Sequence, residues 1–237
     1  MTRNTTIIAL TTVALSSMTS ADIVGVGQYG RYINAIDGFG APDFSGYVVD
    51  LVLISDDPTD TVLNVFDLQM TNSLGDVSYY QSMTGNTWLP NNMGGQFETD
   101  ALRHADSFIS IGGRDSMGSP SYENGLVVQM DPNGSNVDPN FGGVFADQPG
   151  PFAGWYNSNP TNYIGQPVEI NGRLEVFIGR FAINGASAFT LDGIISIGWN
   201  NAIGTPLESA YNVPIPAPGA LAVLGIAGLT GNRRRRA

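Results

Sequence analysis

The stretch RLEVFIGRFAINGASAFTLDGIISIGW, residues 173–199, decides the fold that we expect for this chain. In its second half, apolar residues from Phe189 to Trp199 alternate with Thr, Asp, Ser and Gly, which is the period of two of a half-buried strand. Its first half, Arg173 to Ile183, is a second long run rich in Phe, Ile and Val. Because the turn-forming pair Asn184-Gly185 lies between them, the sequence predicts a hairpin of the two longest strands.

Similar runs recur along the chain, separated by polar breaks such as residues 56–60 (DDPTD) and Gly94-Gly95. Helical periodicity is nearly absent between residues 22 and 212. We therefore predict one all-β domain over residues 22–212, an antiparallel β-sandwich of the jelly-roll type. The other predicted strands are Tyr47 to Ile54, Val62 to Thr71, Val77 to Met83, Phe108 to Ile111, Leu126 to Met130 and Phe152 to Tyr156.

The C-terminal segment, residues 213–237, has a different character. Prolines end regular structure, apolar residues enter lipid as a helix, and consecutive arginines stay on the cytoplasmic side. A C-terminal core helix would leave the arginines unexplained, so we predict a membrane-directed hydrophobic helix whose ten-residue apolar run suits transient insertion. In order, the segment contains Pro214, Pro216, Ala217 and Pro218, the apolar run from Ala220 to Leu229, and Arg233, Arg234, Arg235 and Arg236.

The N-terminal segment, residues 1–21, has the three parts of a secretory signal peptide. Arg3 supplies the positive region, Ile7 to Leu15 the apolar region, and Ser16 to Ala21 a run of mostly small residues. We expect a signal helix here, cleaved between Ala21 and Asp22.

Together, the two terminal segments resemble those of PEP-CTERM proteins, which are exported bacterial proteins whose tail is recognised by a membrane protease-transpeptidase called exosortase. The usual tripeptide is Pro-Glu-Pro, whereas this chain has Pro214-Ile215-Pro216 and Pro216-Ala217-Pro218, similar to a planctomycete-like Pro-Ala-Pro variant. The resemblance implies processing by signal peptidase and an exosortase-like enzyme, with transient insertion into the inner membrane. It also implies sorting to the cell surface or extracellular matrix and an uncharacterised β-rich body, and it implies no activity.

Composition excludes several classes of function. Without the two terminal segments, five arginines stand against 21 acidic residues, a net charge of −16, so nucleic acid is not an expected partner. The chain has no lysine, which excludes Schiff-base and P-loop lysine chemistry. It has no cysteine, which excludes disulfides and a thiol nucleophile.

Catalytic residues are not predicted. His104 is the single histidine and no Gly-x-Ser-x-Gly motif accompanies it, so we expect a surface or loop-packing histidine near Asp100 and Asp106. A glycoside hydrolase of the β-sandwich type, which needs only two carboxylates, is the less favoured alternative. The carboxylates near predicted strands are those of Glu169, Glu175 and Asp192.

Calcium is the one cofactor considered, as a structural ion. Alternating oxygen-bearing side chains occur in one loop at Asp131, Asn133, Ser135 and Asp138, and a second acidic loop has Asp56, Asp57 and Asp60. Neither loop matches the EF-hand pattern. Turn residues that bond their own backbone are the favoured interpretation of both loops.

Sugar binding is the second function considered. Aromatic rings that stack on a pyranose, with amides that bond its hydroxyl groups, occur in loop-like sequence at Trp88, Trp155, Tyr156 and Asn157. We predict an exported structural or adhesive protein of the cell surface or extracellular matrix, with a carbohydrate-binding module as the alternative.

Overall fold

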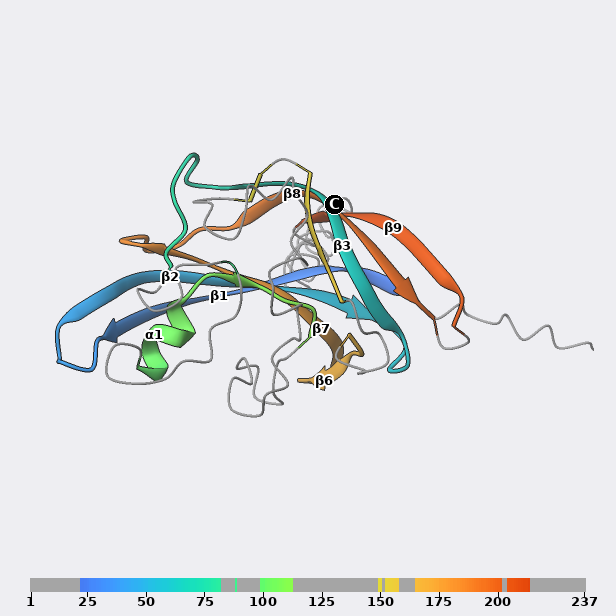
Figure 1. Ribbon diagram of the computed structural model, residues 1–237, viewed down its shortest axis with the longest axis horizontal. Helices are drawn as coiled ribbons and strands as arrows, with labels where there is room; N and C mark the ends of the chain where they lie inside the picture. Colours follow the sequence, from blue (N-terminus) through green and yellow to red (C-terminus); the bar gives the residue numbers. More distant parts are fainter. Residues whose placement is uncertain are drawn as a thin grey trace, which may run out of the picture.

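A computed structural model describes residues 22–81, 88, 99–112, 149–150, 152–157, 165–201 and 204–213. Within these ranges the chain is mostly β, with two antiparallel sheets and one short helix, α1 (Asp100–Ala105) (Figure 1). Sheet A has the order β1 (Ile23–Ile36), β2 (Pro42–Ser55), β7 (Arg173–Asn184), β4 (Phe108–Ile109), and β6 (Val168–Ile170) also pairs with β7. Sheet B has the order β5 (Ala153–Tyr156), β3 (Thr61–Asn72), β8 (Leu191–Asn200), β9 (Pro206–Val213).

The two sheets share one apolar core because the strands alternate inward and outward side chains. On β2, Val49, Leu51 and Leu53 are buried in this core, and Ile195 and Ile197 of β8 reach it from sheet B. Val48, Asp50 and Val52 alternate with them and lie on the opposite, outer face of sheet A.

A β-bulge in β7 changes which of its residues face outward. Leu51 of β2 pairs with Gly179, but the next residue, Val52, pairs with Phe177, so Ile178 is an extra residue in β7. Ile178 therefore lies in the shared core, and Phe177 packs on the outer face with Val52. Beyond the bulge, Arg180 is directly opposite Asp50.

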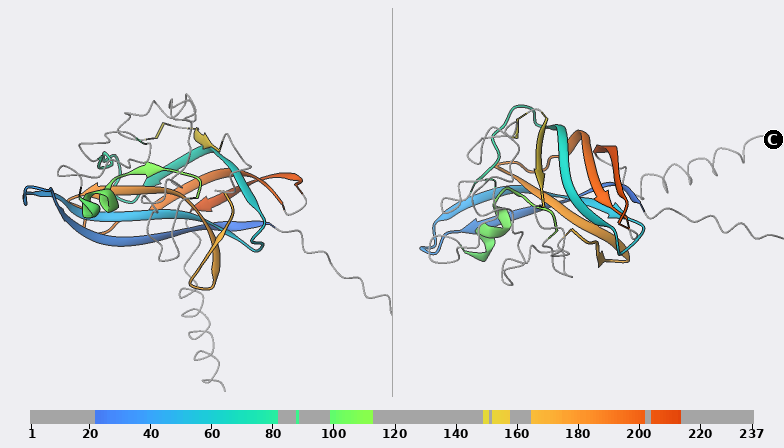
Figure 2. Two further views of the ribbon diagram at one scale, coloured as in Figure 1. Left: turned by 60° about the horizontal axis from the view of Figure 1, so that its bottom comes forward. Right: turned by 45° about the vertical axis from the view of Figure 1, so that its right-hand side comes forward.

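The outer face of sheet A is covered, so it forms a second, smaller buried layer. Helix α1 begins after Thr99, whose hydroxyl oxygen accepts a hydrogen bond from Leu102 N–H at 3.3 Å. Leu102 and Ala105 of α1 pack against Val48 and Ala182, and Figure 2 shows α1 beside β1 and β2. Two charged residues on this face, Asp50 and Arg180, are fully buried.

Several predicted strands are confirmed: those at β2, β3 and β7 lie within the observed strands, and those at β4, β5 and β8 overlap them and begin or end up to two residues outside. The predicted hairpin at Asn184-Gly185 is wrong, because β7 belongs to sheet A and β8 to sheet B, so this segment crosses between the sheets. Gly185 does adopt a turn conformation, with φ of 80°. Residues 77–81 of the strand predicted at Val77 to Met83 are irregular, and β1, β6 and β9 were not predicted.

The predicted signal helix at residues 1–21 lies outside the described residues, as do the predicted strand at Leu126 to Met130 and residues 214–237 of the predicted hydrophobic helix. Val213, which the prediction placed in the tail, is the buried last residue of β9. In the described part of the chain, no helix has the length and apolar character needed to cross a membrane.

Candidate functional site

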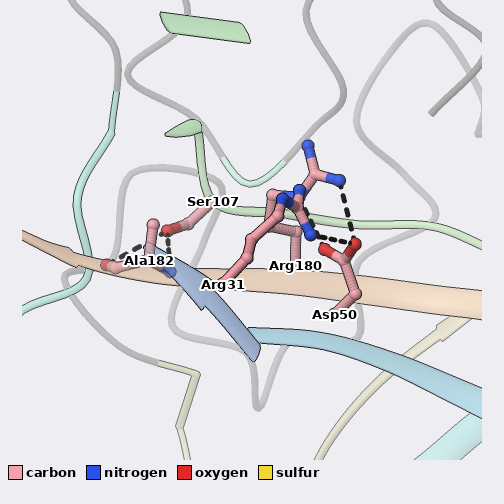
Figure 3. Close-up of polar contacts among 5 residues, drawn as sticks. All are labelled: Arg31, Asp50, Ser107, Arg180 and Ala182. Atoms are coloured by element: carbon pink, nitrogen blue, oxygen red, sulfur yellow. Dashed lines mark hydrogen bonds and ion pairs between the residues drawn. The ribbon is translucent and has the colours of Figure 1, made fainter. Parts of the chain in front are cut away.

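Three charged side chains from three neighbouring strands meet on the outer face of sheet A (Figure 3). Asp50 on β2 binds Arg180 on β7 through two contacts, Nε to Oδ1 at 2.6 Å and Nη2 to Oδ2 at 3.1 Å. Arg31 on β1 contacts Oδ2 of Asp50 through Nη1, also at 2.6 Å. The side chains of Asp50 and Arg180 are fully buried, whereas that of Arg31 is 36 % exposed. We call these three residues the Asp50 cluster.

The charge of the Asp50 cluster follows from two opposing effects. Burial penalises the ionised carboxylate and would by itself raise the pKa of Asp50. The attraction of Arg180 and Arg31 and their hydrogen bonds outweigh burial and hold the pKa of Asp50 below its usual value. Asp50 is therefore ionised at neutral pH and has no proton to donate, and its two carboxylate oxygens accept hydrogen bonds from the arginines of both neighbouring strands. The cluster thereby joins three strands.

Strand β4 completes the surroundings of the Asp50 cluster. The Phe108 ring lies 5.4 Å from the guanidinium carbon of Arg180, which is a cation–π arrangement. The neighbouring Ser107 hydroxyl oxygen accepts a hydrogen bond from Ala182 N–H at 2.9 Å, as Figure 3 shows. Through this contact, a side chain that precedes β4 binds the backbone of β7.

His104, which we expected to be a surface or loop-packing residue, is a half-buried residue of α1 and lies within electrostatic range of the Asp50 cluster. Burial lowers its pKa most, repulsion from Arg180 and Arg31 lowers it further, and attraction by Asp50 opposes these effects. The charges that act on His104 therefore include three from sheet A, together with that of Arg103 on α1, which also lowers its pKa. His104 is neutral at pH 7.

A second buried carboxylate, Glu175, lies on the same face near the beginning of β7. The Tyr29 hydroxyl of β1 donates a hydrogen bond to Oε1 of Glu175, and Arg173 Nε lies 3.6 Å from the same oxygen. Glu175 is only 2 % exposed, so these contacts satisfy a carboxylate that has little access to water.

The carboxylates considered for glycoside hydrolysis do not face one another. Val168 of β6 is directly opposite Glu175, so Glu169 points to the other face of that ladder. Asp192 is an exposed residue of β8 in sheet B, on a different sheet from Glu169 and Glu175. The hydrolase alternative therefore has no support from the arrangement of these three side chains.

A groove lies along the end of β3, where Met70 and Thr71 meet Pro149. It consists of two adjoining hollows of about 270 Å³ and about 420 Å³. The smaller hollow is polar at one end, where the Asn72 amide nitrogen lies 3.4 Å from the Tyr79 hydroxyl. Burial raises the pKa of Tyr79, so its hydroxyl stays protonated at neutral pH. The remaining lining residues are Gly75 and Asp76 in the smaller hollow, and Leu68, Gln69, Gly150 and Phe152 in the larger.

Two of the four residues predicted to bind sugar are core residues. Trp88 is fully buried against Tyr79, and Trp155 is 1 % exposed, with its Nε1–H donating to the carbonyl oxygen of Ser110 at 2.7 Å. Neither ring can stack on a sugar, so the prediction is wrong for both tryptophans, because aromatic burial stabilises the fold. Tyr156 is 40 % exposed at the end of β5, and Asn157 follows it, half-buried.

The acidic loop between β2 and β3 is a turn that bonds its own backbone, which confirms the favoured interpretation for this loop. Oδ1 of Asp57 accepts hydrogen bonds from the backbone N–H and the hydroxyl of Thr59, and these bonds lower the pKa of Asp57. Ser55 Oγ accepts from Asp57 N–H at 3.0 Å. In the described ranges, no group of three Asp, Glu or His side chains is placed to hold a metal ion.

The remaining predicted site residues lie outside the described residues. They are the calcium loop Asp131, Asn133, Ser135 and Asp138, the sorting residues Pro214, Pro216, Ala217, Pro218 and Arg233 to Arg236, and Ala21 on the amino side of the predicted cleavage bond.

Sequence reasoning missed the Asp50 cluster, although a signal for it is present. Asp50 lies in the apolar run VVDLVLI, and Arg180 lies in the apolar run FIGRFAI. A charge in the middle of an apolar strand requires a partner of opposite charge, so each run predicts a buried partner without identifying it. Comparison with protein-family models, curated proteins and solved structures gives no match.

Proposed function

We propose that this chain is an exported protein that acts as a structural or adhesive component of the cell surface or extracellular matrix. In this proposal, the N-terminal segment directs export and the PEP-CTERM-like tail directs sorting after transient insertion into the inner membrane. The two antiparallel sheets then form a single jelly-roll-like β-sandwich that is the mature body.

One observation supports this proposal most directly, which is where the strands begin and end. Strand β1 starts at Ile23, two residues after the end of the predicted signal peptide, and β9 ends at Val213, next to Pro214. Both end residues are buried in the shared core, and the Tyr211 hydroxyl donates to the carbonyl oxygen of Ile23 at 2.5 Å. The two ends of the described body, Ile23 and Val213, are therefore both part of the core, and removing residues 1–21 and 214–237 would leave both in place.

The intact mass of the native protein, from separated cytoplasmic, membrane and extracellular fractions, tests this proposal. We expect a surface or matrix form that begins at Asp22 and ends near the Pro214 to Pro218 segment. A membrane form that retains Arg233 to Arg236 would refute sorting by tail removal. A cytoplasmic form that retains Met1 would refute export.

Carbohydrate binding is the second candidate function. The groove at the end of β3 is a better candidate for the sugar site than the two tryptophans, which are buried. Its smaller hollow combines the Tyr79 ring with oxygen-bearing side chains of Thr71 and Asn72, a combination suited to sugar hydroxyl groups. Affinity electrophoresis against neutral and acidic polysaccharides tests it. Thr71→Trp, which fills the groove, should abolish retardation, while Thr205→Trp, at an exposed position between β8 and β9, should not. Equal retardation of both variants would refute the groove as the site.

A further inference from the structure

Carboxyl side chains gather where β1 begins and where the loop between β2 and β3 turns. They belong to Asp22, Asp56, Asp57 and Asp60, and we call them the acidic end. The backbone N–H of Asp22 donates to Oδ1 of Asp56 at 2.7 Å, and the backbone N–H of Asp56 donates to the carbonyl oxygen of Asp22 at 3.2 Å. The nitrogen of Asp22 is thereby held against a carboxylate.

Asp60 shows that the acidic end is incompletely compensated. Its side chain is fully buried, and one carboxylate oxygen, Oδ2, accepts from the Ser55 hydroxyl at 2.8 Å. Among the described residues, its other oxygen, Oδ1, has no hydrogen-bond partner. Burial raises the pKa of Asp60, and the charges of Asp57, Asp56 and Asp22 raise it further. A positive charge at this place would lower the free energy of the folded state.

Strand β9 faces the same place and supplies no cation there. Burial is the largest cause that raises the pKa of the Tyr211 hydroxyl on β9. The charges of Asp22 and Asp60 raise it further, so Tyr211 lies close to both. The ion pairs formed among the described residues lie instead on the outer face of sheet A, at Asp50 and Glu175.

We propose that cleavage between Ala21 and Asp22 creates a cation at this place, so that the acidic end is a docking site for the chain's own new α-ammonium group. This inference rests on the proposed export and signal cleavage. In the reaction, water adds its hydroxyl group to the carbonyl carbon of Ala21 and a proton to the nitrogen of Asp22 as the C–N bond breaks. The released amine then takes a second proton from solvent and becomes positively charged at neutral pH.

The geometry already suits an ammonium group. The distance of 2.7 Å from the Asp22 nitrogen to Asp56 Oδ1 lies in the range of charge-assisted hydrogen bonds. An amide has one N–H, whereas an ammonium has three, so cleavage adds donors and a positive charge at a residue that lies within electrostatic range of Asp60. Cleavage would thereby strengthen an existing contact.

The absence of lysine permits a direct test, because the α-amine of the processed chain is its only amine. The full chain from Asp22 to Ala237, released from a removable leader so that Asp22 comes first, is exposed to a trace of acetic anhydride at a series of pH values. The extent of acetylation of the α-amine, read by mass spectrometry of the N-terminal peptide, gives the pKa of the unmodified amine. We expect an amine pKa about half a unit above the usual range of about 7.7–8.0, which is the shift produced by a partly exposed ion pair.

Asp56→Asn should return the amine pKa to the usual range. Asp43→Asn, at the other end of β2, should leave the shift unchanged and serves as the matched control. If Asp56→Asn does not fold, 1 M NaCl on the unaltered chain should abolish most of the shift, since salt screens exposed charges. An amine pKa in the usual range, unaltered by Asp56→Asn or salt, would overturn the inference.

Failure of the inference and failure of the proposed function are distinguishable. If the native protein begins elsewhere than Asp22, as read by intact mass, signal cleavage at that bond is wrong. The titration on the chain made to begin at Asp22 still reports whether the acidic end holds an ammonium group.

Discussion

Replacing Asp50 by Asn should be among the most destabilising single changes on the outer face of sheet A. The variant keeps the shape of the side chain but removes the negative charge that compensates Arg180, which has no exposed surface, and Arg31. Leaving a buried charge without its partner costs about 3–5 kcal/mol. We therefore expect Asp50→Asn to lower the free energy of unfolding at pH 7 by about that amount, a large part of the roughly 5–15 kcal/mol of a typical domain.

The same variant should change the response to acid. Because the pKa of Asp50 is lower in the folded state, its stabilising effect is complete above the unfolded pKa of about 3.9 and is lost as pH falls through the folded value. The unaltered chain should therefore lose stability steeply below about pH 4, and Asp50→Asn should remove this part of the slope. Urea unfolding followed by tryptophan fluorescence reads both effects, since Trp88, Trp155 and Trp199 are buried.

Two controls make the result decisive. Asp192→Asn, at an exposed position on β8, should change the free energy of unfolding by less than about 0.5 kcal/mol. The triple change of Asp50 and both arginines to apolar residues should cost far less than Asp50→Asn, because no charge is left uncompensated. A loss below about 1 kcal/mol for Asp50→Asn would refute the argument that this cluster is buried and coupled.

Three further results are expected. The single His104 resonance should titrate below its usual pKa of about 6.5 in NMR, and lower still in Asp50→Asn, which loses an attraction that raises it. Because the folded pKa is depressed, stability should fall as pH drops below about 6.5, and an NMR midpoint at or above that value would contradict this. Ser107→Ala should lower the free energy of unfolding in urea by about 1–3 kcal/mol, since it leaves the buried N–H of Ala182 without an acceptor, and no loss would mean that another group accepts it. Gly193→Ala should prevent the β3–β8 pairing, because φ of Gly193 is 141° and an added Cβ would lie 2.0 Å from the carbonyl oxygen of Gln69 on β3. A variant whose far-UV spectrum and melting temperature match those of the unaltered chain would refute this.

The central strands β2, β3, β7 and β8 were predictable because they are long and apolar, whereas the edge strands β1 and β9 were not. Strand β1 has Gly at residues 25, 27 and 30 and polar residues among them, so its composition resembles a loop, yet pairing with β2 makes it one of the longest strands. At Tyr79 and Tyr80 the error is the opposite one, because a strand is predicted where the backbone is irregular. These strand-favouring residues do reach the buried layers, with Tyr79 against Trp88 and Tyr80 against Phe44, but from irregular backbone.

Topology and the candidate site were less predictable because both depend on long-range pairing. The pair Asn184-Gly185 favours a turn whether the chain returns in the same sheet or crosses to the other one, so local sequence cannot distinguish a hairpin from a crossing. Arg180, which binds Asp50, is 130 residues away along the chain, and only the register of β2 and β7 brings the two side chains together.

The bulge in β7 explains why the Asp50 cluster exists at all. Along β7, Ile178 lies in the shared core, so strict alternation would also direct Arg180 into that core, against the apolar face of sheet B. The extra residue at the bulge restores Arg180 to the outer face, directly opposite Asp50. A slip of β7 by one residue would break the two contacts to Asp50 and bury the guanidinium among apolar side chains, which is far more costly than an apolar mismatch. The cluster therefore penalises wrong registers of β1, β2 and β7, a role that an apolar replacement of equal stability could not fill.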